Sequence, residues 1–297
     1  MNKFVKYLFS LYPPKEISYN SKMFPQKLKQ LNDCPNKIYV IGDETILNDS
    51  LISIVGTRKA SPYGNKLSHD FSSELTKYDF IVVSGMAFGI DRSAHEGATI
   101  NGKTIAVIAG GFEQTINSNN YTIAKLILDH GGTIISEYDS TLPPKAFTFL
   151  RRNRLIAAIS IATIIIEAPF KSGAINTASH CIKLGKPLYC VPWALNYSKG
   201  FGSNSLLKEN ALPLIDIHTI IKKYSNNQID FLNKQLNQIN IPNNLLPYYD
   251  CIKENGPIND ELIYDYFSDK STAEISACLS LLEINSYIKY QDGKYYI

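Results

Sequence analysis

The stretch ISIVGTRKASPYGNKLSHDFSSELTKYDFIVVSG, residues 52–85, decides the fold. It begins and ends with short apolar runs rich in β-branched residues, at 52–57 and 79–85. Between them, residues 64–77 repeat apolar side chains at the i, i+4 spacing of one helix face. Strands buried on both faces of a parallel sheet need such continuous apolar runs. The stretch therefore predicts a strand, a helix and a second strand.

The same alternation continues toward the carboxyl terminus. Four more apolar runs follow, at residues 103–110, 132–138, 161–169 and 187–193. Residues 172–184 again have a helical pattern. Six strands with intervening helices predict an α/β fold with a doubly wound, mostly parallel sheet, which we assign to residues 51–224.

The segments on either side of this domain differ in composition. Residues 1–50 contain Pro13-Pro14, Pro25 and Pro35 and no long period, so we expect a short helical or irregular N-terminal extension packed on the sheet domain. Residues 225–244 are rich in Asn and Gln, which predicts a linker.

Residues 245–297 predict a small C-terminal domain that is winged-helix-like. Three helical patterns, at 245–255, 258–267 and 271–284, precede two alternating strands around Asp292-Gly293, a strong hairpin signal. In such an arrangement the third helix reads duplex DNA. Here that helix carries Glu274 and Glu283 and no Arg or Lys, so protein interaction or a structural role is favoured over DNA reading.

Composition describes an ordinary globular protein, with 44% hydrophobic and 19% charged residues in 297. No apolar run is long enough to span a bilayer, and the opening residues lack the features of a signal peptide. We therefore expect a cytoplasmic protein with no membrane partner. The five cysteines form no CxxC pair, so we expect reduced, structural thiols, no metal and no cofactor.

Charge is distributed unevenly along the chain. Residues 245–297 hold four Lys and nine Asp or Glu, a net of −5, which leaves +8 for residues 1–244. An anionic polymer would therefore bind the larger domain. Only five of the thirty basic residues are Arg, yet Arg151, Arg152 and Arg154 lie within four positions, which indicates a need for the planar, bidentate guanidinium.

Four segments at the carboxyl ends of predicted strands contain the candidate binding residues. They are Gly56, Thr57, Arg58 and Lys59; Ser84 and Gly85; Lys145, Phe147, Phe149, Arg151, Arg152, Asn153 and Arg154; and Lys171, Ser172 and Gly173. Ligands of open α/β sheets bind at this edge. Each segment alone also fits a tight turn or a surface helix with solvated charges. Because all four lie at the carboxyl ends of strands, however, we expect them to meet at one binding site.

These residue types suit unpaired nucleic acid. Glycine loops let backbone N–H groups approach phosphates, arginines hold phosphates, and aromatic rings stack on bases. We expect an unpaired nucleic-acid strand to bind with weak sequence preference and strong salt dependence. We expect no catalytic residue, because His95 stands without a nucleophile motif and suits a structural role.

Taken together, these motifs resemble the DNA-processing protein A (DprA/Smf) family of bacteria. The resemblance runs from about Cys34 to Glu209. It rests on Ile54-Val55-Gly56-Thr57-Arg58, Ser84-Gly85, Gly89-Ile90-Asp91, Ala94-His95, Ser136-Glu137-Tyr138, Phe149, Arg151-Arg152-Asn153-Arg154-Leu155-Ile156-Ala157, Glu167-Ala168 and Ser172-Gly173-Ala174.

The resemblance implies an extended Rossmann fold that binds single-stranded DNA in a positive pocket, forms a homodimer, protects incoming DNA and loads the RecA recombinase during natural transformation. It places Gly56, Thr57, Arg58, Arg151, Arg152, Asn153, Lys171 and Gly173 at that pocket. The apolar pair Leu206-Leu207 is a candidate dimer surface.

Three departures from the family pattern bear on the site. Phe88 stands where the family commonly has Arg, which removes a charge or substitutes a stacking surface. Residues 112–117 differ from the sequence that the family more usually has in this loop. The N-terminal part contains no convincing helix-hairpin-helix module, so duplex binding through such a module is not expected.

Two other functions compete with this one. A Rossmann-type nucleotide hydrolase, similar to the phosphoribohydrolases, would use Glu167 as its carboxylate, but Gly110-Gly111 is not followed by the Gly-Thr of that family. A winged-helix transcription regulator would bind DNA through residues 245–297, whose negative charge counts against it.

Overall fold

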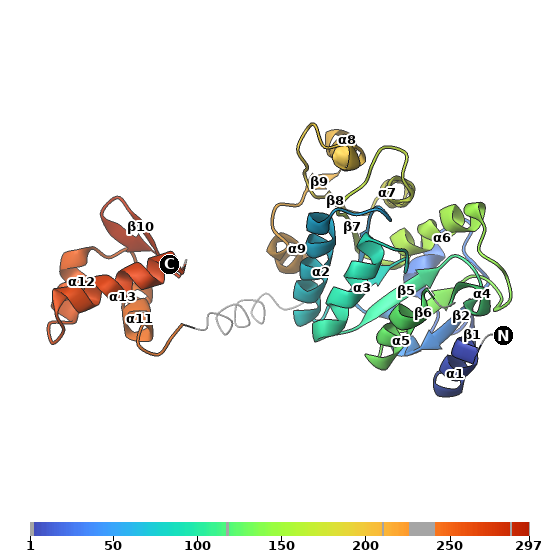
Figure 1. Cartoon of the computed structure of the whole chain (residues 1–297), viewed down its shortest axis with the longest axis horizontal. Coiled ribbons are helices and arrows are strands. Elements are labelled where there is room, and N and C mark those ends of the chain that lie inside the picture. Colours follow the sequence, from blue (N-terminus) through green and yellow to red (C-terminus); the bar gives the residue numbers. More distant parts are fainter. Residues whose placement is uncertain (1–2, 117–118, 210, 226–240, 286, 297) are drawn as a thin grey trace. The chain divides into compact units, whose positions relative to one another are not determined.

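The computed structural model describes residues 3–116, 119–209, 211–225, 241–285 and 287–296. The chain divides into two compact units, Met1–Ser225 and Asn226–Ile297, which are described separately below (Figure 1). Most of the predicted linker, residues 225–244, lies outside the described residues. Within the described residues, every helix is too short or too polar to cross a bilayer.

A nine-stranded sheet forms the centre of the first unit, in the order β1-β2-β6-β5-β4-β3-β7-β8-β9. Its strands are β1 Lys15–Ser18, β2 Lys37–Gly42, β3 Leu51–Val55, β4 Ile81–Ser84, β5 Thr104–Ile108, β6 Thr133–Ser136, β7 Ala162–Ile165, β8 Leu188–Cys190 and β9 Leu212–Pro213. From β6 to β9 all neighbours are parallel. The six predicted strands and the doubly wound α/β class are confirmed.

Helices cover both faces of this sheet (Figure 1). Within β5, Ile105 and Val107 pack in the same core cluster as side chains of α6 (Ala146–Ile159), whereas Ala106 and Ile108 pack with α5 (Tyr121–Asp129). Successive strand residues point to opposite faces, and here both faces are buried. This double burial explains why the strands read as continuous apolar runs.

The remaining helices of this unit connect the strands. They are α1 Lys3–Leu11, α2 Pro62–Lys77, α3 Ile90–Asn101, α4 Phe112–Thr115, α7 Gly173–Lys183, α8 Phe201–Glu209 and α9 His218–Tyr224, with short 3-10 turns at Gln26–Gln30, Glu44–Asn48 and Ser198–Gly200. At the start of α2 the Ser61 hydroxyl accepts a hydrogen bond from the Gly64 N–H, and Pro62 occupies the first turn. Both features are favourable at a helix N-terminus.

The N-terminal 50 residues contribute two strands to the sheet, whereas we expected only a short helical or irregular extension. β1 and β2 extend the sheet, with β2 antiparallel to β6 so that Val40 lies opposite Ile135. Ile38 and Val40 are fully buried in the core. The prolines flank these strands rather than exclude them. β1 has one buried residue and β2 is buried less completely than the parallel strands β3 to β8, so their apolar pattern is weaker.

The proposed dimer surface at Leu206-Leu207 is wrong. Leu206 is 5% exposed and belongs to the core, and Leu207 packs against the same cluster. Both side chains help to anchor α8 on the sheet domain, and Leu206 is not available to a second copy of the chain.

The second unit has the predicted order of elements. It contains α11 Leu246–Asn255, α12 Asp260–Tyr266, α13 Thr272–Ile284, β10 Lys289–Gln291 and β11 Lys294–Tyr296 around its own apolar core. Asp292 and Gly293 have φ of 52° and 75°, the positive values that a tight hairpin turn requires. Ile258 also bridges to Tyr295. The assignment as a winged helix stays a prediction.

Helices α2 and α3 pack so closely that Gly97 has no room for a side chain. A Cβ there would lie 2.0 Å from the His69 carbonyl oxygen. We expect Gly97→Ala to lower the free energy of unfolding by about 1–3 kcal/mol through this clash, although alanine favours helices by about 1 kcal/mol. Urea unfolding followed by the fluorescence of Trp193, the chain's one tryptophan, measures the effect. The neighbouring exposed variant Glu96→Ala should be nearly neutral, and a stabilised Gly97→Ala would contradict the packing.

His95 makes the stability of the first unit depend on pH. It is fully buried, its Nδ1 lies 2.7 Å from Thr104 Oγ1, and Thr104 Oγ1 donates to the Val82 carbonyl oxygen. Nδ1 therefore carries the proton and donates to Thr104. Burial lowers the pKa of His95 to about 3.

Because an unfolded histidine titrates near pH 6.5, the unfolded chain binds an extra proton as pH falls below that value. The stability present above pH 6.5 is then lost, with a slope from His95 approaching about 1.4 kcal/mol per pH unit. Urea unfolding at pH 7 and pH 5 should show this loss, and His95→Gln should reduce it. An unchanged pH dependence in His95→Gln would contradict the assignment.

Candidate functional site

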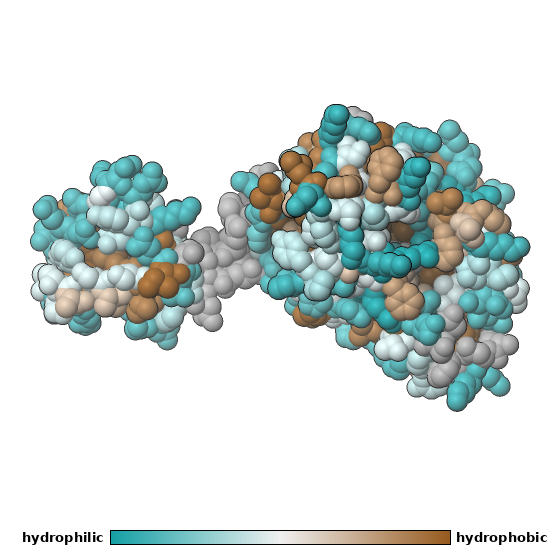
Figure 2. Space-filling model, turned by 45° about the horizontal axis from the view of Figure 1, so that its top comes forward, coloured by the Kyte–Doolittle hydropathy of each residue, from teal (hydrophilic) through white to brown (hydrophobic). Residues whose placement is uncertain are grey.

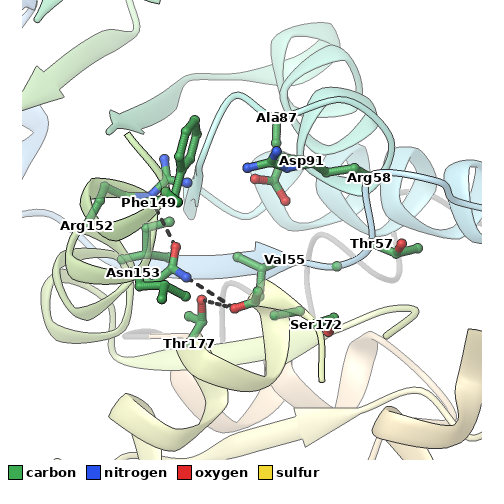
Figure 3. Close-up of a pocket in the computed structure, with 16 residues that line it drawn as sticks. Val55, Thr57, Arg58, Ala87, Asp91, Phe149, Arg152, Asn153, Ser172 and Thr177 are labelled. Atoms are coloured by element: carbon green, nitrogen blue, oxygen red, sulfur yellow. Dashed lines mark hydrogen bonds between the residues drawn. The ribbon is translucent and has the colours of Figure 1, made fainter. Parts of the chain in front are cut away.

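A cavity of about 570 Å³ opens at the carboxyl edge of the sheet, where α6 and α7 begin (Figure 3). Eight predicted residues line it: Gly56, Thr57, Arg58, Phe149, Arg152, Asn153, Ser172 and Gly173. The others that line it were not predicted: Val55, Ala87, Asp91, Ala146, Leu150, Ile156, Ala174 and Thr177. Residues from four distant segments of the chain thus meet at one place.

The loop after β3 is held in place by its backbone. A Cβ on Gly56 would lie 2.5 Å from Ile90 Cγ1 and 2.9 Å from the Glu167 carbonyl oxygen, so only glycine fits. The next residue, Thr57, donates its N–H to that same oxygen at 2.7 Å. Its hydroxyl accepts a hydrogen bond from the Lys59 N–H at 3.2 Å. The loop therefore presents the side chain that follows, Arg58, in a defined direction.

Arg58 is the accessible cation of the cavity. It is exposed, and no carboxylate of the described residues pairs with it. Its Cζ lies 4.6 Å from the centroid of the half-buried Phe149 ring. Figure 3 shows the Arg58 side chain reaching toward Phe149 across the cavity. An unpaired guanidinium over an aromatic face combines a phosphate ligand with a stacking surface.

Arg152 also lines the cavity, but the protein itself uses much of its hydrogen-bonding capacity. The side chain is buried, and its Nη1 donates to the carbonyl oxygens of Gly85, at 2.8 Å, and Val107. Nε donates to Asn153 Oδ1 at 3.2 Å. Burial lowers the pKa of Arg152 to about 10, so it stays positive at neutral pH. We expected a phosphate ligand, and the structure shows a buried structural cation at the cavity wall.

Asp91 is the buried carboxylate beside this cation. It accepts a hydrogen bond from the Gly85 N–H at 3.1 Å, and the N–H groups of Gly56 and Ala87 also face it. Burial raises the pKa of Asp91, while Arg152 and these N–H groups oppose that shift. Gly89 is the N-cap of α3, and Asp91 lies in the first turn of that helix. The sequence signal that could have identified Asp91 as a cavity residue is an acidic side chain in the first turn of a helix that follows a glycine-containing loop.

Asn153 joins α6 to the start of α7. Its Nδ2 donates to the Gly173 carbonyl oxygen at 3.2 Å and to Asn176 Oδ1 at 3.1 Å (Figure 3). A Cβ on Gly173 would meet only Asn153 Nδ2, at 4.0 Å. The backbone at the N-terminus of α7 is therefore open to the cavity, where peptide N–H groups favour an anion.

Arg151 and Arg154 lie away from the cavity. They share a face of α6, where Nη2 of each contacts Glu137 Oε1, at 3.2 Å and 2.6 Å. Arg154 is buried, and its Nε is 3.0 Å from Asp33 Oδ2. These ion pairs tie α6 to the segment after β6 and to the N-terminal segment. The structure therefore does not bring the whole arginine cluster to one binding surface.

The other predicted residues surround the cavity without lining it. Lys59, Lys145 and Lys171 are exposed and adjoin lining residues in sequence, and Phe147 is 61% exposed. Ser84 is buried and donates its hydroxyl to the Ile54 carbonyl oxygen at 2.6 Å. Gly85 instead donates its N–H to Asp91, and its carbonyl oxygen accepts a hydrogen bond from Arg152.

Glu167 does not line the cavity. Its Oε2 accepts hydrogen bonds from the N–H and the hydroxyl of Ser61, both at 2.9 Å. Its Oε1 accepts from the Tyr197 hydroxyl at 2.8 Å. This buried carboxylate connects three loops, and its oxygens are engaged rather than free to act on a bound nucleotide.

The different environments of Arg152 and Arg58 predict different costs of removing them. Arg152→Ala leaves Asp91 buried without its countercharge, so we expect the free energy of unfolding to fall by about 3–5 kcal/mol. Arg58→Ala removes an exposed side chain and should cost within about 1 kcal/mol. Urea unfolding of both variants measures the difference, and equal costs would contradict the structural role of Arg152.

Comparison with known proteins identifies relatives of this chain. The family model for DNA recombination-mediator protein A matches residues 15–225. Protein Smf of Escherichia coli is 30% identical over 207 residues, covering 69% of this chain. DNA processing protein DprA of Bacillus subtilis is 30% identical over 217 residues, covering 72% of this chain. The chain spans about half of the Escherichia coli protein, 55%, and 73% of the Bacillus subtilis protein.

A solved structure extends the comparison to the fold. DNA processing protein A of Helicobacter pylori, described for its single-stranded DNA binding mode, superposes with a TM-score of 0.65 at 32% identity. The match covers 72% of this chain and 96% of that one. Together with the family match over residues 15–225, it shows that this chain belongs to the DNA recombination-mediator protein A family, the DprA/Smf proteins.

Proposed function

We propose that this protein binds single-stranded DNA at the cavity of its first unit and does no chemistry on it. The observation that carries the proposal is the exposed, unpaired Arg58 guanidinium stacked on Phe149 at the cavity. A binding site needs a cation that the protein has not already neutralised, and Arg58 meets that condition.

The surroundings of Arg58 support a polyanion as the ligand. Exposed Lys59, Lys145 and Lys171 flank the cavity, and the N-terminus of α7 opens into it at Gly173. Phosphates would lie against these groups while a base stacks on Phe149. Such contacts do not distinguish bases, so the sequence preference should be weak.

The related Helicobacter pylori protein supports the same ligand, because its structure was described for binding single-stranded DNA. The nucleotide hydrolase is less well supported. Glu167, the carboxylate that such an enzyme would use, is engaged by Ser61 and Tyr197 outside the cavity.

The proposal extends to the role of the bound strand. We infer that the protein acts in the cytoplasm as a homodimer, protects incoming single-stranded DNA and loads the RecA recombinase onto it in natural transformation and recombination. The support is the family's description as recombination mediators. The acidic second unit, at a net −5, is unsuited to holding the strand itself.

Fluorescence-anisotropy titration of a labelled single strand and its duplex, at two salt concentrations, tests the ligand. We expect preferential, salt-sensitive binding of the single strand, weakened at least tenfold by Arg58→Ala, because one charge-assisted phosphate contact is lost. The matched control is Lys183→Ala, which removes an exposed charge at the far end of α7. Equal affinity for duplex, or no effect of Arg58→Ala, would refute the proposal.

A further inference from the structure

We propose that Phe88, backed by Arg92, is a base-stacking platform that extends the DNA site beyond the cavity. This inference rests on the proposed function and adds a second contact to it. Phe88 belongs to the loop between β4 and α3 and is 52% exposed.

Exposure alone does not single out this side chain. Hydrophobic side chains are scattered among hydrophilic ones over the face of the first unit in Figure 2, and single exposed apolar residues are normal. Two further observations distinguish Phe88: its position beside the cavity, and the guanidinium that covers its ring.

The position follows from backbone contacts. Ala87 lines the cavity, and Gly89, with φ of 76°, lies against the Arg58 loop. A Cβ on Gly89 would be 2.4 Å from the Thr57 carbonyl oxygen and 2.9 Å from that of Arg58. Phe88 stands between these two residues, so its loop adjoins the loop that carries Arg58.

The ring of Phe88 is supported from one side. Arg92 Cζ lies 5.4 Å from the ring centroid. The Arg92 guanidinium is held in turn, because its Nη2 donates to the Asn119 carbonyl oxygen at 3.2 Å and its Nε is 3.8 Å from Glu96 Oε1. A positioned cation therefore covers part of the ring, and about half of the residue remains free to contact a ligand.

These features fit an unpaired base better than they fit a phosphate. A base stacks on an aromatic face whatever its identity, and the nearby cation attracts the strand that carries it. One helical turn after this ring, Arg92 supplies a positive charge. The segment thus combines a stacking surface with a nearby cation.

Anisotropy titrations with an oligo-dT strand test the platform. Phe88→Ala should weaken binding about 5- to 150-fold, the range for one stacked base, with an unchanged dependence on salt. Phe88→Tyr keeps the ring and should bind within twofold of the parent protein. Tyr266→Ala removes an exposed aromatic from the second unit and serves as the matched control.

A strand of the same length built from abasic sites, titrated at low salt, separates stacking from phosphate contact. On it Phe88→Ala should bind within twofold of the parent, whereas Arg58→Ala should remain weakened. If the parent binds oligo-dT and Arg58→Ala weakens it, but Phe88→Ala does not, the platform is refuted and the proposed function stands. A loss in Phe88→Tyr as large as in Phe88→Ala also refutes the platform. If the parent binds no single strand, both proposals fail.

Discussion

The buried guanidinium of Arg152 is the interaction on which the site depends. It donates to the carbonyl oxygens of Gly85 and Val107, at the ends of two neighbouring strands, and it lies beside the buried carboxylate of Asp91. A charge taken out of water is stable only where hydrogen bonds and an opposite charge replace its hydration. Gly85 directly follows β4, Val107 lies in β5, and Asp91 lies in α3. Arg152 therefore connects the sheet edge to α6, the helix that carries Phe149.

The arginines divide into a structural group and an accessible one. Arg154 is neutralised by Glu137 and Asp33, and Arg151 shares Glu137, so their charge fixes the position of α6. Arg58 instead projects from a loop whose backbone is held at Gly56 and by Glu167. Because this loop is held rigidly, little conformational entropy should be lost when Arg58 binds a ligand. The cavity therefore has a fixed wall and a rim that is open to ligand.

Several parts of this arrangement were predictable because local chemistry dictates them. The strands from Leu51 to Cys190 are buried on both faces, so each one reads as a continuous apolar run. The positions of Gly56 and Gly173 at the cavity were predictable because ligands bind at the carboxyl edge of such sheets. Strands β1 and β2 escaped detection because they are less completely buried than the parallel strands β3 to β8. Asp91 did because a single acidic residue in a helix has several common roles.

The sequence by itself determined the fold class, the family and the edge of the sheet at which the candidate segments meet. It did so because apolar periodicity and loop chemistry are local properties. Only the tertiary structure decided what each charged side chain does. Arg151, Arg152 and Arg58 look alike in sequence, but Glu137 neutralises the first, strand carbonyls and Asp91 occupy the second, and the third meets no carboxylate among the described residues. Those partners lie far from the arginines in the sequence, so only the folded structure shows which partner each arginine has.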